Sequence, residues 1–179
     1  MNYDALIIID MQIALVEDHP YNERLIIENI KKLIEVSRNN DVPIVYIQHD
    51  GGTGDELEYG SEGWKIYKEI EPEADDKIID KQYNSMFYQT KLQEYLKSIH
   101  AKNLILCGMQ SEYCFDVSCK VAFENGYKVI VPKDTTTTYD NEFFKAKDLV
   151  RYYEEKIWDG RYADVVSVEM IVQELDHTN

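Results

Sequence analysis

Short, unbroken apolar runs alternate along the chain with longer segments in which apolar residues recur at helical spacing. The runs, such as Ala5–Ile9 and Asn103–Cys107, have the length and composition of strands that are buried on both faces. The longer segments have the periodicity of amphipathic helices, as where Ile26, Ile30 and Leu33 share one face. Strands that alternate with helices imply right-handed crossovers, so we predict an α/β fold in which helices cover both faces of a parallel sheet.

The apolar runs place the predicted strands in chain order. They are Ala5–Ile9, Pro43–Ile47, Lys77–Asp80, Asn103–Cys107, Tyr127–Val131 and Asp164–Val168. No internal repeat or linker interrupts the alternation, so residues 1–179 are predicted to form one domain.

Polar residues mark the predicted helix ends. Asn22, Ser111 and Asp140 are predicted N-caps, and Thr90–Gln93 has the pattern of a capping box. Gly126 is predicted to end the helix after Ser111 in the left-handed conformation.

Two segments lack a clear period. Gly51–Trp64 is rich in glycine and acidic residues, and its length predicts a binding loop or a lid. The run of four threonines at 135–138 is predicted to be a turn and not a site.

Composition and charge exclude several classes of protein. No apolar run approaches the ~20 residues that span a bilayer, and Met1–Asp4 enters the first strand without the basic region of a signal peptide. The three cysteines have no framework spacing, which predicts reduced thiols in a cytoplasmic protein. The net charge of -15 disfavours nucleic acid and anionic membranes as partners, and we expect it to make the surface soluble.

The segment Gly108–Cys114 connects a buried strand to a helix. Cys114 is predicted to lie in the first helical turn, where backbone N–H groups and the helix dipole favour a thiolate. A cysteine in this place is a candidate nucleophile, although most free cysteines are small buried hydrophobic residues. The segment alone leaves both interpretations open.

Residues at the ends of other strands favour the interpretation of Cys114 as a nucleophile. Asp10 follows the first strand and Lys81 follows the third, and ligands of open parallel sheets bind at these carboxyl ends. Asp10 can accept the proton of Cys114, while Lys81 can stabilise both the carboxylate and the thiolate. Backbone N–H groups before Cys114 can form an oxyanion hole, which suits acyl transfer to the thiol and then hydrolysis.

These residues lie in three motifs that resemble those of the isochorismatase-like cysteine hydrolases, which include nicotinamidases and N-carbamoylsarcosine amidohydrolases. Leu6–Gln12 resembles the opening aspartate motif of the superfamily. Asp80-Lys81 followed by Ser85–Phe87 resembles its lysine segment, and Gly108–Cys114 resembles its Gly-x-x-(Ser/Thr)-x-x-Cys segment. The motifs stand in family order from the first strand to the last.

The resemblance implies a Rossmann-like three-layer α/β/α sandwich with about six parallel strands. It implies a triad of Cys114, Asp10 and Lys81, and a cis peptide between Met109 and Gln110 that aims the amides of Gln110 and Cys114 at the substrate oxygen. The expected reaction is cleavage of a small-molecule C–N bond (amide, lactam or carbamoyl) through a Cys114 thioester, without a cofactor. It also implies a homo-oligomer, a dimer or larger.

The sequence departs from the superfamily in one place that bears on metals. Nicotinamidases bind a metal through an Asp and two His after the second strand, but Gln48–Gly52 contains only His49 beside Asp50. A lone His–Asp pair is typical of a loop anchor, so we predict no catalytic metal and do not expect nicotinamide as substrate. Isochorismatases that act on a vinyl ether lack the cysteine in their best-known members, so Cys114 argues against that reaction too. The sequence of Met109–Cys114, together with the upstream segments Gly54–Leu57 and Glu62–Trp64, most resembles that of the streptothricin hydrolase-like branch.

Substrate-binding candidates flank the predicted strand ends. They are Gln12, His49, Trp64, Phe87, Gln110 and Tyr113. The aromatic residues among them have packing as their alternative role. Cys107 and Cys119 are predicted to be structural.

Three other classes of protein are alternatives to a hydrolase. In a redox or stress-response thiol protein, Cys114 would be oxidised and not acylated. Such a protein has no leaving amine to protonate, so it needs no Asp10–Lys81 pair. A nucleotide-binding domain is disfavoured because no GxGxxG follows the first strand. A catalytically silent binding protein of the same fold has no need to keep all three triad positions.

Overall fold

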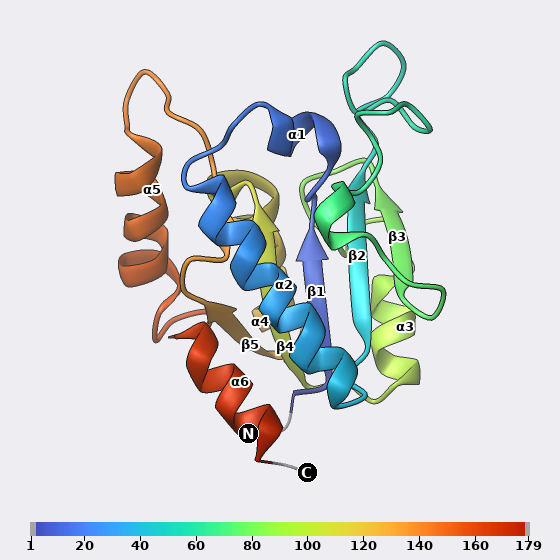
Figure 1. Cartoon of the computed structure of the whole chain (residues 1–179), viewed down its shortest axis with the longest axis vertical. Helices are drawn as coiled ribbons and strands as arrows, with labels where there is room; N and C mark the ends of the chain where they lie inside the picture. Colours follow the sequence, from blue (N-terminus) through green and yellow to red (C-terminus); the bar gives the residue numbers. More distant parts are fainter. Residues whose placement is uncertain (1–2, 178–179) are drawn as a thin grey trace.

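The computed structural model describes residues 3–177 as an open sheet with helices on both faces (Figure 1). Met1 and Asn2, part of the predicted leaderless N-terminus, lie outside the described residues. The strands are β1 (Ala5–Ile9), β2 (Ile44–His49), β3 (Lys77–Lys81), β4 (Asn103–Met109), β5 (Lys128–Pro132), β6 (Thr136–Thr137) and β7 (Asp164–Val166). The helices are α1 (Ile13–Glu17), α2 (Glu23–Asn39), α3 (Leu92–Ser98), α4 (Asp116–Glu124), α5 (Ala146–Tyr152) and α6 (Val168–Asp176), with the turns η1 (Lys68–Ile70), η2 (Ser111–Phe115) and η3 (Tyr153–Trp158).

The strands pair in parallel in the order β3-β2-β1-β4-β5-β7, which confirms the predicted three-layer α/β fold. β6 lies off this path and pairs with the end of β4. The sheet has seven strands instead of about six because part of the threonine run extends it. The prediction that this run is a turn is wrong, since Thr136–Thr137 form a strand that pairs with β4, and Thr135–Thr138 are all buried. Every helix within residues 3–177 is too short or too polar to span a bilayer.

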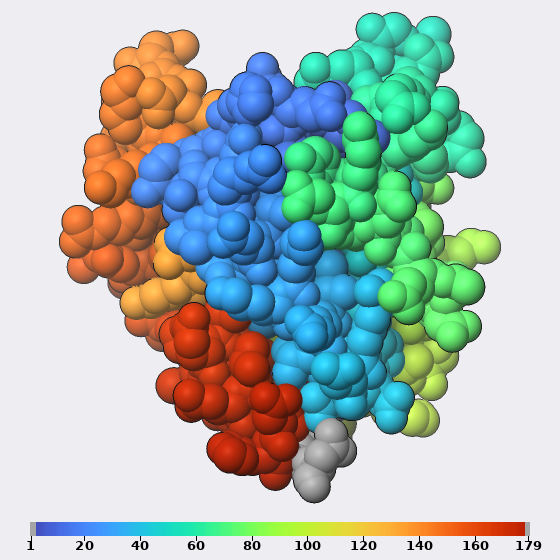
Figure 2. Space-filling view, in the orientation of Figure 1, coloured from blue at the N-terminus to red at the C-terminus, as the bar shows by residue number. Residues whose placement is uncertain are grey.

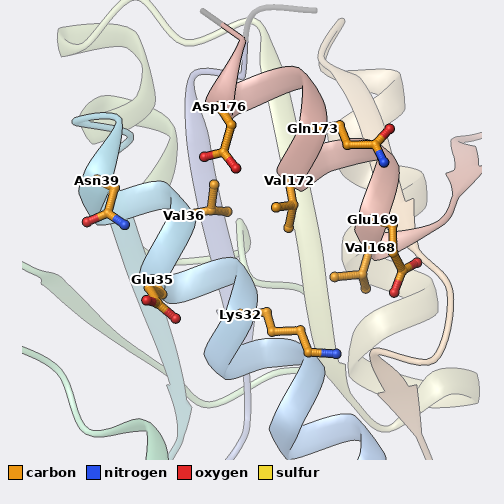
Figure 3. A pocket seen from close by; sticks show the side chains of 9 residues that line it. All are labelled: Lys32, Glu35, Val36, Asn39, Val168, Glu169, Val172, Gln173 and Asp176. Carbon is orange, nitrogen blue, oxygen red and sulfur yellow. The ribbon is translucent and has the colours of Figure 1, made fainter. Parts of the chain in front are cut away.

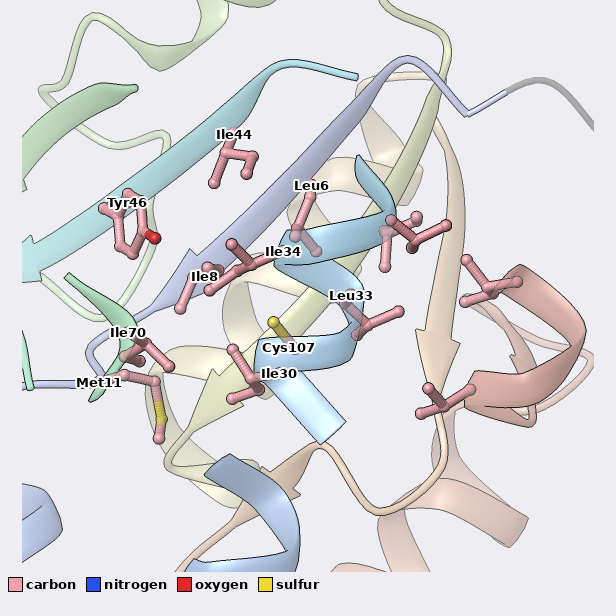
Figure 4. Close-up of a cluster of buried hydrophobic side chains, with 14 of the residues drawn as sticks. Leu6, Ile8, Met11, Ile30, Leu33, Ile34, Ile44, Tyr46, Ile70 and Cys107 are labelled. Carbon is pink, nitrogen blue, oxygen red and sulfur yellow. The ribbon is translucent and has the colours of Figure 1, made fainter. Parts of the chain in front are cut away.

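Strand residues alternate between two hydrophobic clusters, one on each face of the sheet. On β1, Leu6 packs in the cluster with α2 and α6, whereas the next residue, Ile7, packs in the cluster with α3 and α4. Figure 4 shows the first cluster, in which residues of α2 lie over β1 and β2. Cys107 belongs to this cluster and Cys119 to the other, and both side chains are fully buried, as predicted for structural cysteines.

The predicted end of α4 is confirmed. Gly126 has a φ of +87°, and its N–H donates to the carbonyl of Phe123 at 2.9 Å. The N–H of Tyr127 donates to the carbonyl of Ala122 at 3.1 Å, which completes a Schellman motif.

The predicted helix starts are less accurate. Asn22 holds the N-cap position of α2 but makes no side-chain capping bond, and Ser111 lies inside η2. Lys91, and not Thr90, holds the N-cap position of α3. α5 begins only at Ala146, whose N–H still donates to the Asp140 carboxylate at 2.9 Å. Polar side chains can bond to other groups in place of the helix N-terminus, as Ser111 does with Thr136 and Thr137.

Glu154 in η3 is a buried carboxylate that gives a pH-dependent prediction. Burial raises its pKa to about 7, the negative charge of Asp134 adds to this, and its Oε1 has no hydrogen-bond partner among the described residues. When folding raises the pKa of a carboxyl group, the folded protein becomes less stable as the pH rises from the pKa of the unfolded state through that of the folded state. We expect Glu154→Gln to increase the free energy of unfolding at pH 8 by on the order of 2 kcal/mol and to have little effect near pH 4.

Urea denaturation at the two pH values checks this expectation. Glu155→Gln is the matched control, because the neighbouring Glu155 is exposed and its carboxylate bonds to Arg151. An equal effect of Glu154→Gln at both pH values would contradict the prediction.

The carboxyl ends of the central strands meet below α1. In Figure 2, α1 lies between two raised segments, the Gly51–Trp64 segment in teal and the segment before α5 in orange. The candidate site residues lie at this edge of the sheet.

Candidate active site

Strand register brings the predicted triad to one edge of the sheet. Asp10 follows β1, Lys81 ends β3 and Cys114 lies in η2 after β4. His49, the last residue of β2, pairs with Lys81, and β1 lies between β2 and β4. Asp10, His49, Lys81 and Cys114 therefore come from four consecutive positions in the sheet.

The ammonium of Lys81 is the centre of this group. Its side chain is 0% exposed, and Nζ lies 2.7 Å from Asp10 Oδ2. Nζ also lies 3.0 Å from His49 Nδ1 and 3.1 Å from Cys114 Sγ. An ammonium has three hydrogens and no acceptor, so these three atoms satisfy it completely.

His49 is neutral in this arrangement. Because Lys81 donates, Nδ1 of His49 accepts and the ring proton resides on Nε2. Burial lowers the pKa of His49, and the positive charge of Lys81 lowers it further.

The surroundings of Cys114 favour its protonated form. Burial raises its pKa to about 12, and the charge of Asp10 also raises it, whereas Lys81 lowers it. The predicted effects of the helix start and of Lys81 are thus outweighed by desolvation and by the adjacent carboxylate. The cysteine needs a base at the moment of attack.

Asp10 carries a free acceptor beside the thiol. Its side chain is 2% exposed, and Oδ1 has no hydrogen-bond partner within residues 3–177. An oxygen of Asp10, Sγ of Cys114 and a ring nitrogen of His49 all lie within 4.8 Å of one another. A proton on Sγ therefore has a carboxylate within reach.

The turn that presents Cys114 has π-helical hydrogen bonding. The peptide between Met109 and Gln110 is cis, in agreement with the family resemblance. The carbonyl of Gln110 accepts from the N–H groups of Tyr113 and Phe115 at 3.0 and 3.2 Å. The second of these bonds spans five residues, which is the spacing of a π-turn.

The buried threonine run supports this turn from behind. Ser111 Oγ contacts Thr136 Oγ1 and the carbonyl of Thr137, both at 3.2 Å. Thr138 Oγ1 donates to Glu112 Oε1 at 2.8 Å. These supporting residues were not predicted from the sequence, although a run of β-branched residues is itself a signal for a strand.

Asn84 is a second residue that was not selected from the sequence. Its Oδ1 lies 3.8 Å from Cys114 Sγ, on the exposed side of the thiol. Asn84 stands between Lys81 and the Ser85–Phe87 motif, so its place in the lysine segment was the available signal.

Gln12 has a different position from the one predicted. It is fully buried, and its carboxamide bonds to the main chain of His49 and to the carbonyl of Trp64. The prediction that Gln12 contacts substrate is therefore wrong, because its polar atoms are occupied inside the protein. Its role is to hold the end of the Gly51–Trp64 segment against β2.

The aromatic candidates divide between the site and the core. Phe87 is partly buried against the cluster with α3 and α4 and stacks on Tyr127, which precedes β5 and so lies at the amino-terminal ends of the strands. Its prediction as a pocket residue is wrong. Tyr113 is 53% exposed beside Cys114, and Trp64 is partly buried with its ring 4.6 Å from that of Tyr59.

One surface hollow includes a candidate site residue, and a larger one lies elsewhere on the protein. A hollow of about 270 Å³ beside β3 includes Lys81. It is lined by Asp50, Tyr59, Asp80, Lys81, Gln82, Tyr83 and Gln89. A larger hollow of about 450 Å³ lies between α2 and α6, where the residues in Figure 3 face one another, and it contains none of the candidate residues.

Asp10, His49 and Cys114 carry atoms of the kinds that bind zinc. However, Lys81 Nζ lies within 3.1 Å of an atom of each residue. The three side chains thus surround an ammonium, and this arrangement fits an ion-pair site better than a metal centre.

The fold and the site define the class as a parallel α/β protein with a buried lysine between an aspartate and a cysteine. The Isochorismatase domain family model matches residues 4–169. The chain belongs to the isochorismatase family.

Relatives agree with this assignment. The isochorismatase family protein YddQ of Bacillus subtilis is 28% identical over 94% of this chain and 98% of its own length. A streptothricin hydrolase of Streptomyces noursei is 29% identical over 76% of this chain, and the match covers 50% of that enzyme. A crystal structure of an isochorismatase family protein has a TM-score of 0.84 at 29% identity, over 91% of this chain and 97% of that one.

Proposed function

We propose that this chain is a cysteine hydrolase that cleaves an amide, lactam or carbamoyl C–N bond of a small molecule. Cys114 is the nucleophile, Asp10 the general acid and base, and Lys81 their electrostatic partner. The observation that carries the proposal is the buried Lys81 ammonium, 2.7 Å from Asp10 Oδ2 and 3.1 Å from Cys114 Sγ.

The first step forms a thioester. Asp10 Oδ1 takes the proton of Cys114 as sulfur attacks the carbonyl carbon, so charge moves from the carboxylate to the carbonyl oxygen. The N–H groups of Gln110 and Cys114 are the proposed donors to that oxygen. Asp10 then gives its proton to the leaving nitrogen as the C–N bond breaks, which leaves an acylated Cys114 and a free amine.

The second step restores the enzyme. Asp10 removes a proton from water as the water oxygen attacks the thioester carbon. The C–S bond then breaks, Asp10 returns the proton to the sulfur of Cys114, and a carboxylic or carbamic acid is released. Lys81 stabilises the negative charge that alternates between Asp10 and Cys114. His49, Trp64, Gln110 and Tyr113 remain candidates for substrate contact around these atoms.

Two observations support a C–N bond over oxidation of the thiol. The motifs resemble those of amidohydrolases, whose leaving group needs a proton that Asp10 can supply. In addition, redox-sensing cysteines have low pKa values, whereas burial raises that of Cys114 to about 12.

A screen of small amides, lactams and carbamoyl compounds tests the proposal, with amine release measured and acylation of the intact protein followed by mass spectrometry. We expect Cys114→Ser to lower kcat by about 10⁴-fold or more and to abolish the acyl adduct, because the serine hydroxyl is much less acidic and a weaker nucleophile than the thiol. Cys119→Ala is the matched control, since that cysteine is buried in the core, and it should change kcat only a few-fold. Full activity in Cys114→Ser, or turnover without dependence on Asp10, would contradict the mechanism.

A further inference from the structure

We propose that His49 is a positioning residue for Lys81, and that the buried carboxamide of Gln12 holds His49 in the place that this requires. The kinetic part of this inference rests on the proposed function. The chemical part concerns the reactivity of the Cys114 thiol and can be tested without a substrate.

The hydrogen-bond capacity of the ammonium gives His49 its importance. Lys81 Nζ has an acceptor for each of its hydrogens, and His49 Nδ1 at 3.0 Å is the one that lies outside the triad. A buried N–H that loses its acceptor retains the full cost of desolvation. Without His49, Lys81 therefore gains by turning or shifting, and its distances to Asp10 and Cys114 change together.

The backbone of His49 is held by the side chain of Gln12. Gln12 Oε1 accepts the N–H of His49 at 2.8 Å, and Gln12 Nε2 donates to the carbonyl of His49 at 2.9 Å. The carboxamide thus bonds both main-chain groups of the last residue in β2. Because Gln12 is 0% exposed, water does not compete for these bonds.

The imidazole and main-chain contacts of His49 form one connected path from Gln12 to Lys81. The neutral tautomer of His49 agrees with this path, since only an unprotonated Nδ1 accepts from an ammonium. Burial and the charge of Lys81 both lower the pKa of His49, which keeps that acceptor available.

Gln48 provides a matched comparison for Gln12. Both side chains are buried, and both donate to the carbonyl of Trp64, at 2.9 Å from Gln48 and 2.8 Å from Gln12. Only Gln12 also bonds the main chain of His49 through its side chain, among the residues that the structure describes. Substitution of each glutamine therefore separates the anchoring of the Gly51–Trp64 segment from the positioning of His49.

Alkylation of Cys114 by iodoacetamide, followed by mass spectrometry between pH 6 and pH 10, tests the inference. We expect His49→Ala and Gln12→Ala to slow the reaction about tenfold near pH 8, as a rise of about one unit in the pKa of Cys114 requires. His49→Asn places an amide oxygen near the position of Nδ1, so it should recover the wild-type rate to within about threefold. Gln48→Ala should stay within about twofold of wild type.

Each outcome bears on the inference. Unchanged or faster alkylation in His49→Ala would overturn it, as would an equal effect of Gln12→Ala and Gln48→Ala. If His49→Asn is as slow as His49→Ala, the ring and not its acceptor matters, and the positioning role is wrong. Should His49→Ala also label the buried Cys107 and Cys119, which reports unfolding, the comparison of the two glutamine variants decides.

A substrate found in the amide screen adds a kinetic test. A positioning role predicts that His49→Ala lowers kcat about tenfold or more with little change in KM, whereas loss of a substrate contact raises KM. If no substrate is found, the alkylation result still stands, so failure of the proposed function and failure of this inference are distinguishable.

Discussion

Replacement of Lys81 by methionine should lower the free energy of unfolding by about 3–5 kcal/mol, because it leaves the carboxylate of Asp10 buried without a counter-charge. The two side chains are 0% and 2% exposed and lie 2.7 Å apart. Methionine has a similar length, so the change removes the charge with little change in volume. Urea denaturation at pH 7 measures the difference.

Two comparisons make this result specific. Lys128→Met removes a partner of Asp164 in an exposed ion pair of 3.0 Å and should cost less than about 1 kcal/mol. Adding Asp10→Asn to Lys81→Met removes the uncompensated charge and should recover part of the stability. If Lys81→Met and Lys128→Met unfold at the same urea concentration as wild type, the buried ion pair has no energetic role.

Gly108→Ala should prevent the chain from reaching a stable native state. A Cβ atom at this position would lie 2.0 Å from the carbonyl oxygen of Ile9 and 2.7 Å from its nitrogen, and both atoms belong to the backbone of the adjacent strand. The φ of Gly108 is +119°, which lies in a region that favours glycine. Separation of β1 from β4 would displace Asp10 and the turn to Cys114, so we expect a loss of more than about 4 kcal/mol.

Gly126→Ala is the control for Gly108→Ala. Its φ of +87° is also positive, but a Cβ atom at this position would have no neighbouring atom within 4 Å among the described residues. Only the conformational cost remains, and it should be about 1–2 kcal/mol. Thermal melts and soluble yield distinguish the two variants, and similar melting temperatures would show that close approach of β1 and β4 is not required.

The local pattern was sufficient for the elements that depend on local physics. Apolar runs such as Leu6–Ile9 identified the strands because a strand buried on both faces needs an apolar residue at every position. Gly126 identified the end of α4 because that conformation is governed by the residue itself. The motifs around Asp10, Lys81 and Cys114 identified the family because they occur in the same order as in the family.

Tertiary structure decided what depends on partners that are far apart in the sequence. The role of Gln12 depends on the fold, which encloses its side chain against His49 and Trp64. Phe87 likewise lies against the core and stacks on Tyr127, a residue far from it in the sequence. Burial and the charge of Asp10 raise the pKa of Cys114, whereas a position at a helix start alone would lower it.

The sequence by itself therefore determined the α/β class and the family, and it selected the three residues of the proposed triad, since periodicity and motif order are properties of the chain alone. Only the tertiary structure decided the surroundings of Cys114, the third acceptor of Lys81 and the burial of Gln12. Desolvation and hydrogen-bond partners arise when segments from different strands meet, and no local pattern contains them.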